Sequence, residues 1–137
     1  MSNGNITHFS FKTNNKMKNI ILEKTEEFGK KISRLNIYLI KEKHEYTRSD
    51  QILRSGTSIG ANSMESRSAQ STADFINKLQ IALKEADETS YWLQLFLKID
   101  YINQEQFDSL DSELQEIIKI LVSIIKKTKE SAGSLNS

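Results

Sequence analysis

Apolar residues recur at helical spacing in successive segments of the chain, with polar residues between them. Nothing alternates with period two for long enough to indicate a strand, so the pattern predicts an all-α protein. Three segments have long seams with steps of three and four. The seams are Ile21, Thr25, Phe28, Ile32, Leu35 and Leu39; Phe75, Leu79, Ala82, Ala86, Thr89, Leu93, Phe96 and Asp100; and Phe107, Leu110, Leu114, Ile117, Leu121, Ile124 and Thr128.

Small residues crowd a fourth segment, residues 51–66, which reads QILRSGTSIGANSMES. Glycine in a helix interior costs roughly 1 kcal/mol relative to alanine, so Gly56 and Gly60 need a structural reason. Ile52, Gly56 and Ile59 recur at helical spacing, as does Ser63. We therefore predict a helix in which the two glycines allow a neighbouring backbone to approach closely.

Helix starts are marked by three segments that resemble capping boxes, residues 47–50, 71–74 and 103–106. Four helices with short links predict an up-down-up-down four-helix bundle. The bundle is expected to span residues 17–130. Residues 1–16 are expected to form a mobile tail, and residues 131–137 a frayed end.

Composition bears on the cellular location of the protein and on whether it associates with a membrane. The 137 residues include no proline and no cysteine, which suits uninterrupted helices and a reducing, cytoplasmic location. No apolar run approaches the ~20 residues that span a bilayer, and the N-terminus lacks a signal-peptide core. We therefore expect a cytoplasmic protein with no membrane partner.

Signatures of enzymes are missing from the sequence. His8 and His44 belong to no metal-ligand spacing, and Glu85-x-x-Glu88 lacks the histidine that a di-iron bundle requires. The sequence thus predicts a non-enzymatic protein without catalytic residues, cofactor or metal.

Polar residues of the small-residue segment share one helical face, because their spacings are four, four and three. These residues are Arg54, Ser58, Asn62 and Glu65, and Glu88 lies on the next predicted helix. One interpretation is a site for a ligand or an RNA phosphate. The other is a network between helices or subunits, with Arg54 paired to Glu65 or Glu88.

Charge is distributed unevenly although the net charge is only +1. One predicted end of the bundle collects Lys12, Lys16, Lys18, Arg67, Lys126, Lys127 and Lys129. The other end collects Asp100, Glu105, Asp108, Asp111, Glu113 and Glu116, and no Lys or Arg lies between Ile99 and Ile118. This pattern fits helix-dipole compensation, and it fits a surface that binds nucleic-acid phosphates.

Several motifs in order resemble those of the "four helix bundle protein" family, also called 23S rRNA-intervening-sequence proteins. The motifs are residues 52–62 (ILRSGTSIGAN), 69–71 (AQS), 73–76 (ADFI), 82–86 (ALKEA) and 88–93 (ETSYWL). The family is similar in fold to the accessory variability proteins of diversity-generating retroelements. The chain departs from the family at Ser63, where an apolar residue is usual, so packing there is expected to be poorer.

The resemblance implies a four-helix protomer that assembles into a homopentameric ring. It also implies a link to nucleic acid, because the retroelement relatives of the family bind nucleic acid. Apolar residues beside the first seam, such as Ile37 and Ile40, also favour an oligomer. We expect an accessory protein that binds RNA or DNA backbone through the basic end of the ring. The alternative is a protein-interaction scaffold with no nucleic-acid role.

Overall fold

The computed structural model describes the backbone of residues 2–136 and the side chains of residues 16–133. Over this range the chain forms α1 (Ser2–Lys43), α2 (Thr47–Glu65), α3 (Thr72–Lys98) and α4 (Gln104–Asn136), with one short 3-10 turn, η1 (Ser66–Ser68), after α2. The described residues contain no strand, so the predicted all-α class is confirmed. None of these helices combines the length and apolar content that crossing a bilayer requires.

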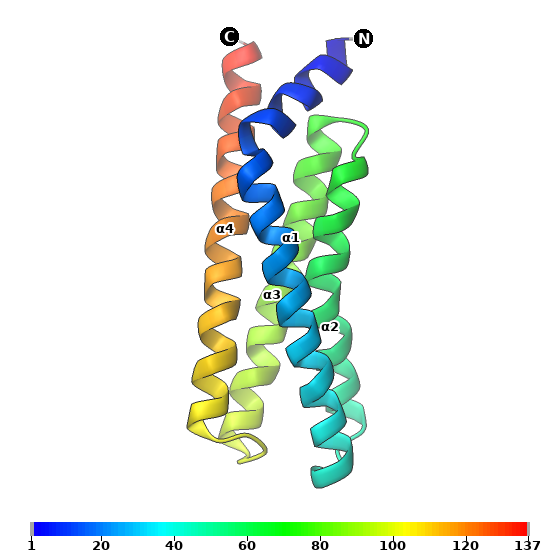
Figure 1. Ribbon diagram of the computed structural model, residues 1–137, viewed down its shortest axis with the longest axis vertical. Helices are drawn as coiled ribbons and strands as arrows, with labels where there is room; N and C mark the ends of the chain where they lie inside the picture. The colour runs from blue at the N-terminus through cyan, green and yellow to red at the C-terminus, as the bar shows by residue number, and fades with distance from the viewer. Residues whose placement is uncertain (1, 137) are drawn as a thin grey trace.

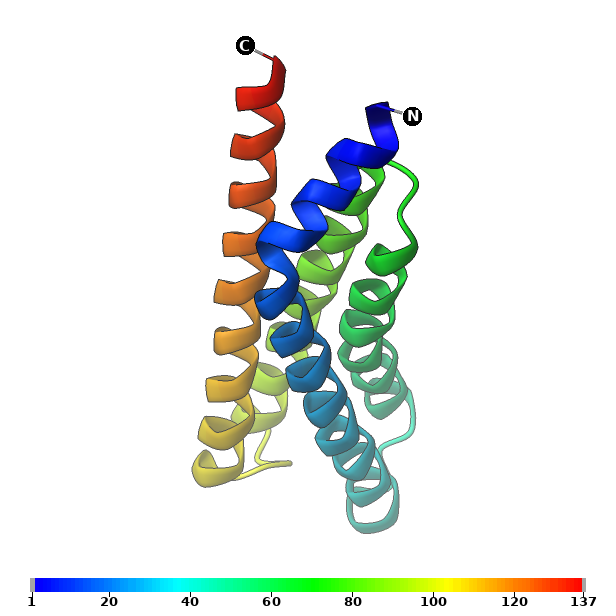
Figure 2. The same ribbon diagram turned by 45° about the horizontal axis from the view of Figure 1, so that its top comes forward.

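The four helices run alternately up and down, and each packs on the helix before it in the chain (Figure 1). α4 also packs against α1, which closes the bundle. The first turns of α1, the α2–α3 link and the last turns of α4 lie at one end, called here the terminal end (Figures 1 and 2). The α1–α2 and α3–α4 links lie at the opposite end.

The outer helices are longer than the sequence analysis predicted. α1 begins at Ser2 and includes residues 2–16, which were assigned to a tail, and α4 continues to Asn136 through most of residues 131–137. The physical reason is that helix propagation costs far less than nucleation, and no proline interrupts either segment.

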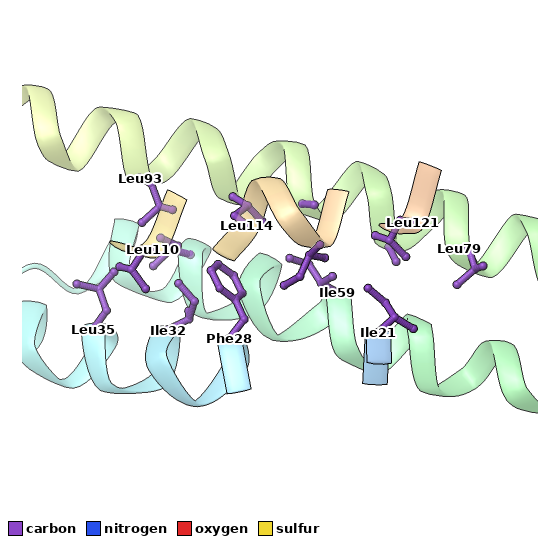
Figure 3. Close-up of a cluster of buried hydrophobic side chains, with 14 of the residues drawn as sticks. Ile21, Phe28, Ile32, Leu35, Ile59, Leu79, Leu93, Leu110, Leu114 and Leu121 are labelled. Atoms are coloured by element: carbon purple, nitrogen blue, oxygen red, sulfur yellow. The ribbon is translucent and has the colours of Figure 1, made fainter. Parts of the chain in front are cut away.

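Side chains of the predicted seams fill the centre of the bundle. Figure 3 shows residues from all four helices converging, among them Phe28 of α1, Ile59 of α2, Leu93 of α3 and Leu114 of α4. These four side chains are fully buried, and each such burial contributes about 1.5–3 kcal/mol. Thr25, Thr89 and Thr128 are also buried within their seams, and each hydroxyl donates to a carbonyl one turn earlier.

Of the three predicted capping boxes, residues 103–106 form a reciprocal box, and residues 71–74 form only its first half. Ser71 accepts a hydrogen bond from the Asp74 amide at 3.0 Å, and Asn103 and Gln106 exchange side-chain to amide bonds of 2.8 Å. The prediction for Thr47 was wrong, because Thr47 is already the first residue of α2. The Glu45 carboxylate caps this helix instead, accepting from the Arg48 amide at 3.2 Å.

Asp100 does not belong to the buried stripe of α3, to which the sequence analysis assigned it. It is exposed and adopts φ of 62°, the left-handed conformation that ends helices. Its amide donates to the Leu97 carbonyl and the Tyr101 amide donates to the Phe96 carbonyl, as in a Schellman motif. The Tyr101 ring stacks on Phe96, which supplies the hydrophobic contact typical of that motif.

The two glycines of α2 face α1. A Cβ atom added at Gly56 would lie 2.8 Å from Cγ2 of Ile32, and one at Gly60 would lie 3.3 Å from Oγ1 of Thr25. Ile32 is fully buried, and its β-branched side chain has little rotational freedom. The close approach of α1 and α2 therefore depends on the missing side chain at Gly56.

We expect Gly56→Ala to lower the free energy of unfolding, because the added Cβ would lie too close to Ile32. This contact is expected to outweigh the higher helix propensity of alanine, which is about 1 kcal/mol. Gly29→Ala is the matched control, because Gly29 lies inside α1 with no neighbour within 4 Å of the added Cβ. The control is expected to raise stability by up to about 1 kcal/mol. Chemical denaturation followed by circular dichroism measures both.

The larger substitution Gly56→Leu is expected to disrupt packing or assembly, because overpacked cores must shift their backbone. A Gly56→Leu protein with the melting temperature and mass of the wild type would show that α1 and α2 do not depend on this contact.

Candidate functional site

Arg54 joins α2 to α3 through two carboxylates. Its Nη1 lies 2.9 Å from Oε2 of Glu85, and its Nη2 lies 2.5 Å from Oε2 of Glu88. The Trp92 indole Nε1 also donates to Oε2 of Glu88, at 3.2 Å. Nearer the core, the Thr89 hydroxyl is hydrogen-bonded to the Ser55 hydroxyl at 3.0 Å. Polar contacts therefore connect α2 to α3 from the core to the surface.

Electrostatics keep both partners of this cluster charged. Burial acts to raise the pKa of Glu88, but hydrogen bonds from Arg54 and Trp92 outweigh it and leave that pKa below its usual value. The hydrogen bond to Glu88 in turn raises the pKa of Arg54. The guanidinium thus serves as an ion-pair partner between helices, with about half of its side chain exposed.

The other predicted members of this polar face do not join the cluster. Ser58 donates to the carbonyl of Arg54, and the Asn62 amide donates to the carbonyl of Ser58, so both bond within α2. Glu65 pairs with Lys78 at 3.6 Å instead of with Arg54. Of the two partners expected for Arg54, only Glu88 contacts it, and the arrangement is that of an inter-helix network.

Glu85 is the member that the sequence analysis missed, because Glu85-x-x-Glu88 was considered only as an incomplete di-iron motif. The signal that could have found it is its i,i+3 spacing from Glu88, which places two carboxylates side by side on α3. An arginine has enough donors to bind both.

The terminal end carries exposed cations, as the sequence predicts. Lys16, Arg67, Lys126, Lys127 and Lys129 are exposed, and in the described part of the chain none of them forms an ion pair. Nζ of Lys127 lies 3.6 Å from Sδ of Met17, which connects α4 to α1. The side chain of Lys12 lies outside the described residues.

Lys18 departs from the prediction because it is buried. Only 4% of the residue is exposed, and its Nζ lies 4.8 Å from the centroid of the Phe75 ring, over the ring face. Burial, together with the charge of Arg67, lowers the pKa of Lys18 to about 7. Lys18 therefore contributes to packing at the terminal end and does not present its ammonium to a phosphate.

The cations of α4 are not in the last turn of their helix. α4 continues to Asn136, seven residues beyond Lys129, and the field of a helix end falls off within about one turn. Arg67 lies in η1, the 3-10 turn that directly follows α2, so it does lie at a helix C-terminus, as Lys41 and Lys43 do in the last turn of α1. Compensation of helix dipoles therefore accounts for Arg67 but not for the three lysines of α4.

The opposite end is less acidic than predicted. Glu113 and Glu116 lie along the α1–α4 contact, where they pair with Lys31 at 2.8 Å and Lys24 at 2.7 Å. The end itself carries Asp100, Glu105, Asp108 and Asp111, but it also carries Lys41, Lys43 and Lys98. Among the residues that the structure describes, no group of three or more His, Asp or Glu side chains is arranged to hold a metal ion.

Comparison with known proteins identifies the family of this chain. The family described as 23S rRNA-intervening sequence protein matches residues 17–123, and the chain belongs to it. The chain is 53% identical to a crystal structure from Bacteroides thetaiotaomicron, described as a protein with unknown function from the S23 ribosomal protein family. That match covers 80% of this chain and 98% of the other, with a TM-score of 0.79. No protein with a curated function matches the chain.

We expect Arg54→Gln to lower the free energy of unfolding by about 1 kcal/mol at pH 7, because it removes two charge-assisted hydrogen bonds at a half-exposed position. The pKa of Glu88 is lowered in the folded protein, so its contribution is present above the usual value of 4.5 and is lost as the pH falls below it. The difference between wild type and variant should therefore shrink below about pH 4.5 in urea titrations.

Lys78→Gln is the matched control, because it breaks a longer single contact between the same two helices. It is expected to change stability by less than about 0.5 kcal/mol. Equal effects of the two substitutions at every pH would contradict the role assigned to Arg54.

Proposed function

We propose that this protein is a non-enzymatic accessory protein that binds the phosphate backbone of RNA or DNA through its terminal end. The observation that carries the proposal is the group of exposed cations there without ion-pair partners among the described residues: Lys16, Arg67, Lys126, Lys127 and Lys129. Lysine and arginine bind phosphates, and binding of this kind is largely independent of sequence.

Family membership supports this proposal through the family's description, which refers to an intervening sequence of 23S rRNA. The matched region ends at residue 123, so the three lysines of α4 lie beyond it. Lys16 also lies outside it, so Arg67 is the one member of the proposed surface within the matched region, and the lysines are features of this chain's own sequence.

Assembly into a homopentameric ring is the second part of the proposal. The exposed apolar side chain of Ile37 on α1, 56% exposed, favours a contact between copies, and the sequence resemblance implies five of them. In a ring whose subunits point the same way, the terminal ends form one basic rim. Several weak phosphate contacts on one rim bind far better than the contacts of one protomer.

Binding is expected to weaken steeply with salt, with a log–log slope of about −0.7 to −0.9 for each phosphate neutralised. Reversing Lys126, Lys127 and Lys129 to glutamate should weaken binding to all sequences about equally and reduce the steepness of that slope. Filter binding of labelled RNA and DNA from ~50 mM salt upward measures both quantities.

The matched control reverses Lys43, Lys84 and Lys98 to glutamate, which changes the net charge equally away from the terminal end. It should leave most of the binding intact. Equal losses in the two variants would show that overall charge, and not the terminal end, attracts the nucleic acid. Absence of binding at ~50 mM salt would favour the protein-interaction scaffold instead.

Assembly has a test of its own. Light scattering at micromolar concentration is expected to give a mass five times that of the protomer. A stable protomer mass would contradict the ring, and it would leave the phosphate-binding surface to be judged by the titration alone.

A further inference from the structure

Two adjacent helices carry opposite charge on their outer faces in the half of the bundle away from the termini. On α1, Arg34, Ile37 and Lys41 are exposed, and their spacings of three and four place them on one face, called here the α1 strip. On α4, Glu105, Asp108 and Asp111 lie at three-residue spacing and form the α4 strip.

The strips do not neutralise each other within one subunit. An open groove of about 580 Å³ lies between α1 and the first turns of α4. Arg34 of the α1 strip and Glu105 of the α4 strip both line it, and they form no ion pair across it. In the described part of the chain, neither Arg34 nor Lys41 forms an ion pair. Asp108 and Asp111 accept hydrogen bonds from the amides of Gln104 and Gln115 on their own helix. Each subunit therefore presents a basic strip and an acidic strip that lack charged partners.

The strips match in length and overlap in level. At 1.5 Å per residue, the α1 strip is about 10 Å long and the α4 strip about 9 Å long. Tyr38 of α1 and Asn103, the residue before α4, line the same groove, and the Lys31–Glu113 pair lies at the other side of the same region. The two strips therefore overlap in height along the bundle, with Lys41 toward the end where α4 begins.

We propose that the α1 strip of one copy packs against the α4 strip of the next copy. This inference rests on the assembly proposed above, and it names the surfaces that form it. With subunits pointing the same way, α1 and α4 meet antiparallel, so Lys41 faces Glu105 and Arg34 faces Asp111 of the neighbouring copy. Ile37 lies between the two charge pairs, where its exposed side chain becomes covered.

A second copy fits this surface better than an unrelated partner because both complementary strips belong to the same chain. The contact joins two different surfaces, and a head-to-tail contact of this kind generates a ring when its rotation closes. α1 and α4 are neighbouring helices of the bundle, so one subunit presents the two strips on different helices (Figure 1). The overlap of the strips in height keeps the rise between copies small, which suits a ring and not a filament.

The test uses two double reversals and their combination. Arg34→Glu with Lys41→Glu makes both strips acidic, and Glu105→Lys with Asp111→Lys makes both predominantly basic. The fourfold combination reverses both members of each proposed pair, and circular dichroism checks that Glu105→Lys, in the first turn of α4, leaves the helix folded. Each double variant is expected to require a protein concentration about tenfold higher or more for half-maximal assembly. The fourfold variant, which exchanges the charges of the two strips, is expected to restore assembly.

Ile37→Asp is a further variant that leaves the charge pairs in place and should also weaken assembly. Its matched control is Val122→Asp, because Val122 is similarly exposed at 47% but lies on α4 outside both strips. Mass is measured by sedimentation velocity, and circular dichroism of each variant reports whether the helices are folded.

The outcomes separate this contact from the assembly itself. A monomeric wild type overturns both the ring and the contact. An oligomeric wild type whose mass persists in the double variants and in Ile37→Asp overturns the contact alone. Loss of assembly in folded double variants, without recovery in the fourfold variant, also overturns the pairing of the two strips.

Discussion

The close approach of α1 and α2 at Gly56 is the contact on which the rest of the bundle depends. The Ile32 side chain of α1 occupies the space that a Cβ atom at Gly56 would take, so the α2 backbone packs directly on that side chain. Gly60 and Thr25 repeat this contact one turn along α2. Because α2 is also the helix that carries Arg54, the depth at which it packs sets the position of that guanidinium relative to Glu85 and Glu88 on α3.

Polar contacts decide how the helices are aligned, while apolar burial supplies most of the stabilisation. α2 and α3 are connected by the Ser55–Thr89 and Arg54–Glu88 bonds, and α1 and α4 by the Lys24–Glu116 and Lys31–Glu113 pairs. These polar pairs form only when the helices stand in one register, and they add to the register that the close-packed seams set. The ion pairs are therefore more valuable for specificity than for net stability.

Charge is arranged on this bundle at two levels with different consequences. The acidic and basic residues at most helix ends match the dipoles of their own helices, and need no other explanation. The dipole of α4 does not account for Lys126, Lys127 and Lys129, because the helix continues past them. The proposed contact between the α1 and α4 strips would orient all subunits alike and place these lysines on one rim, so the two proposals support each other while remaining separately testable.

Local rules were enough to predict the seams, the caps at Ser71 and Asn103, and the need for small residues in α2, because helical periodicity and capping act within a few residues. Thr47 and Asp100 were misassigned, since a carboxylate just outside the helix and a left-handed residue at its end compete with the simple pattern. Burial of Lys18 beside Phe75, and the choice of Glu85 and Glu88 over Glu65 as partners of Arg54, were decided by the tertiary structure. Those outcomes depend on the relative register and rotation of separate helices, which arise only when all four pack together.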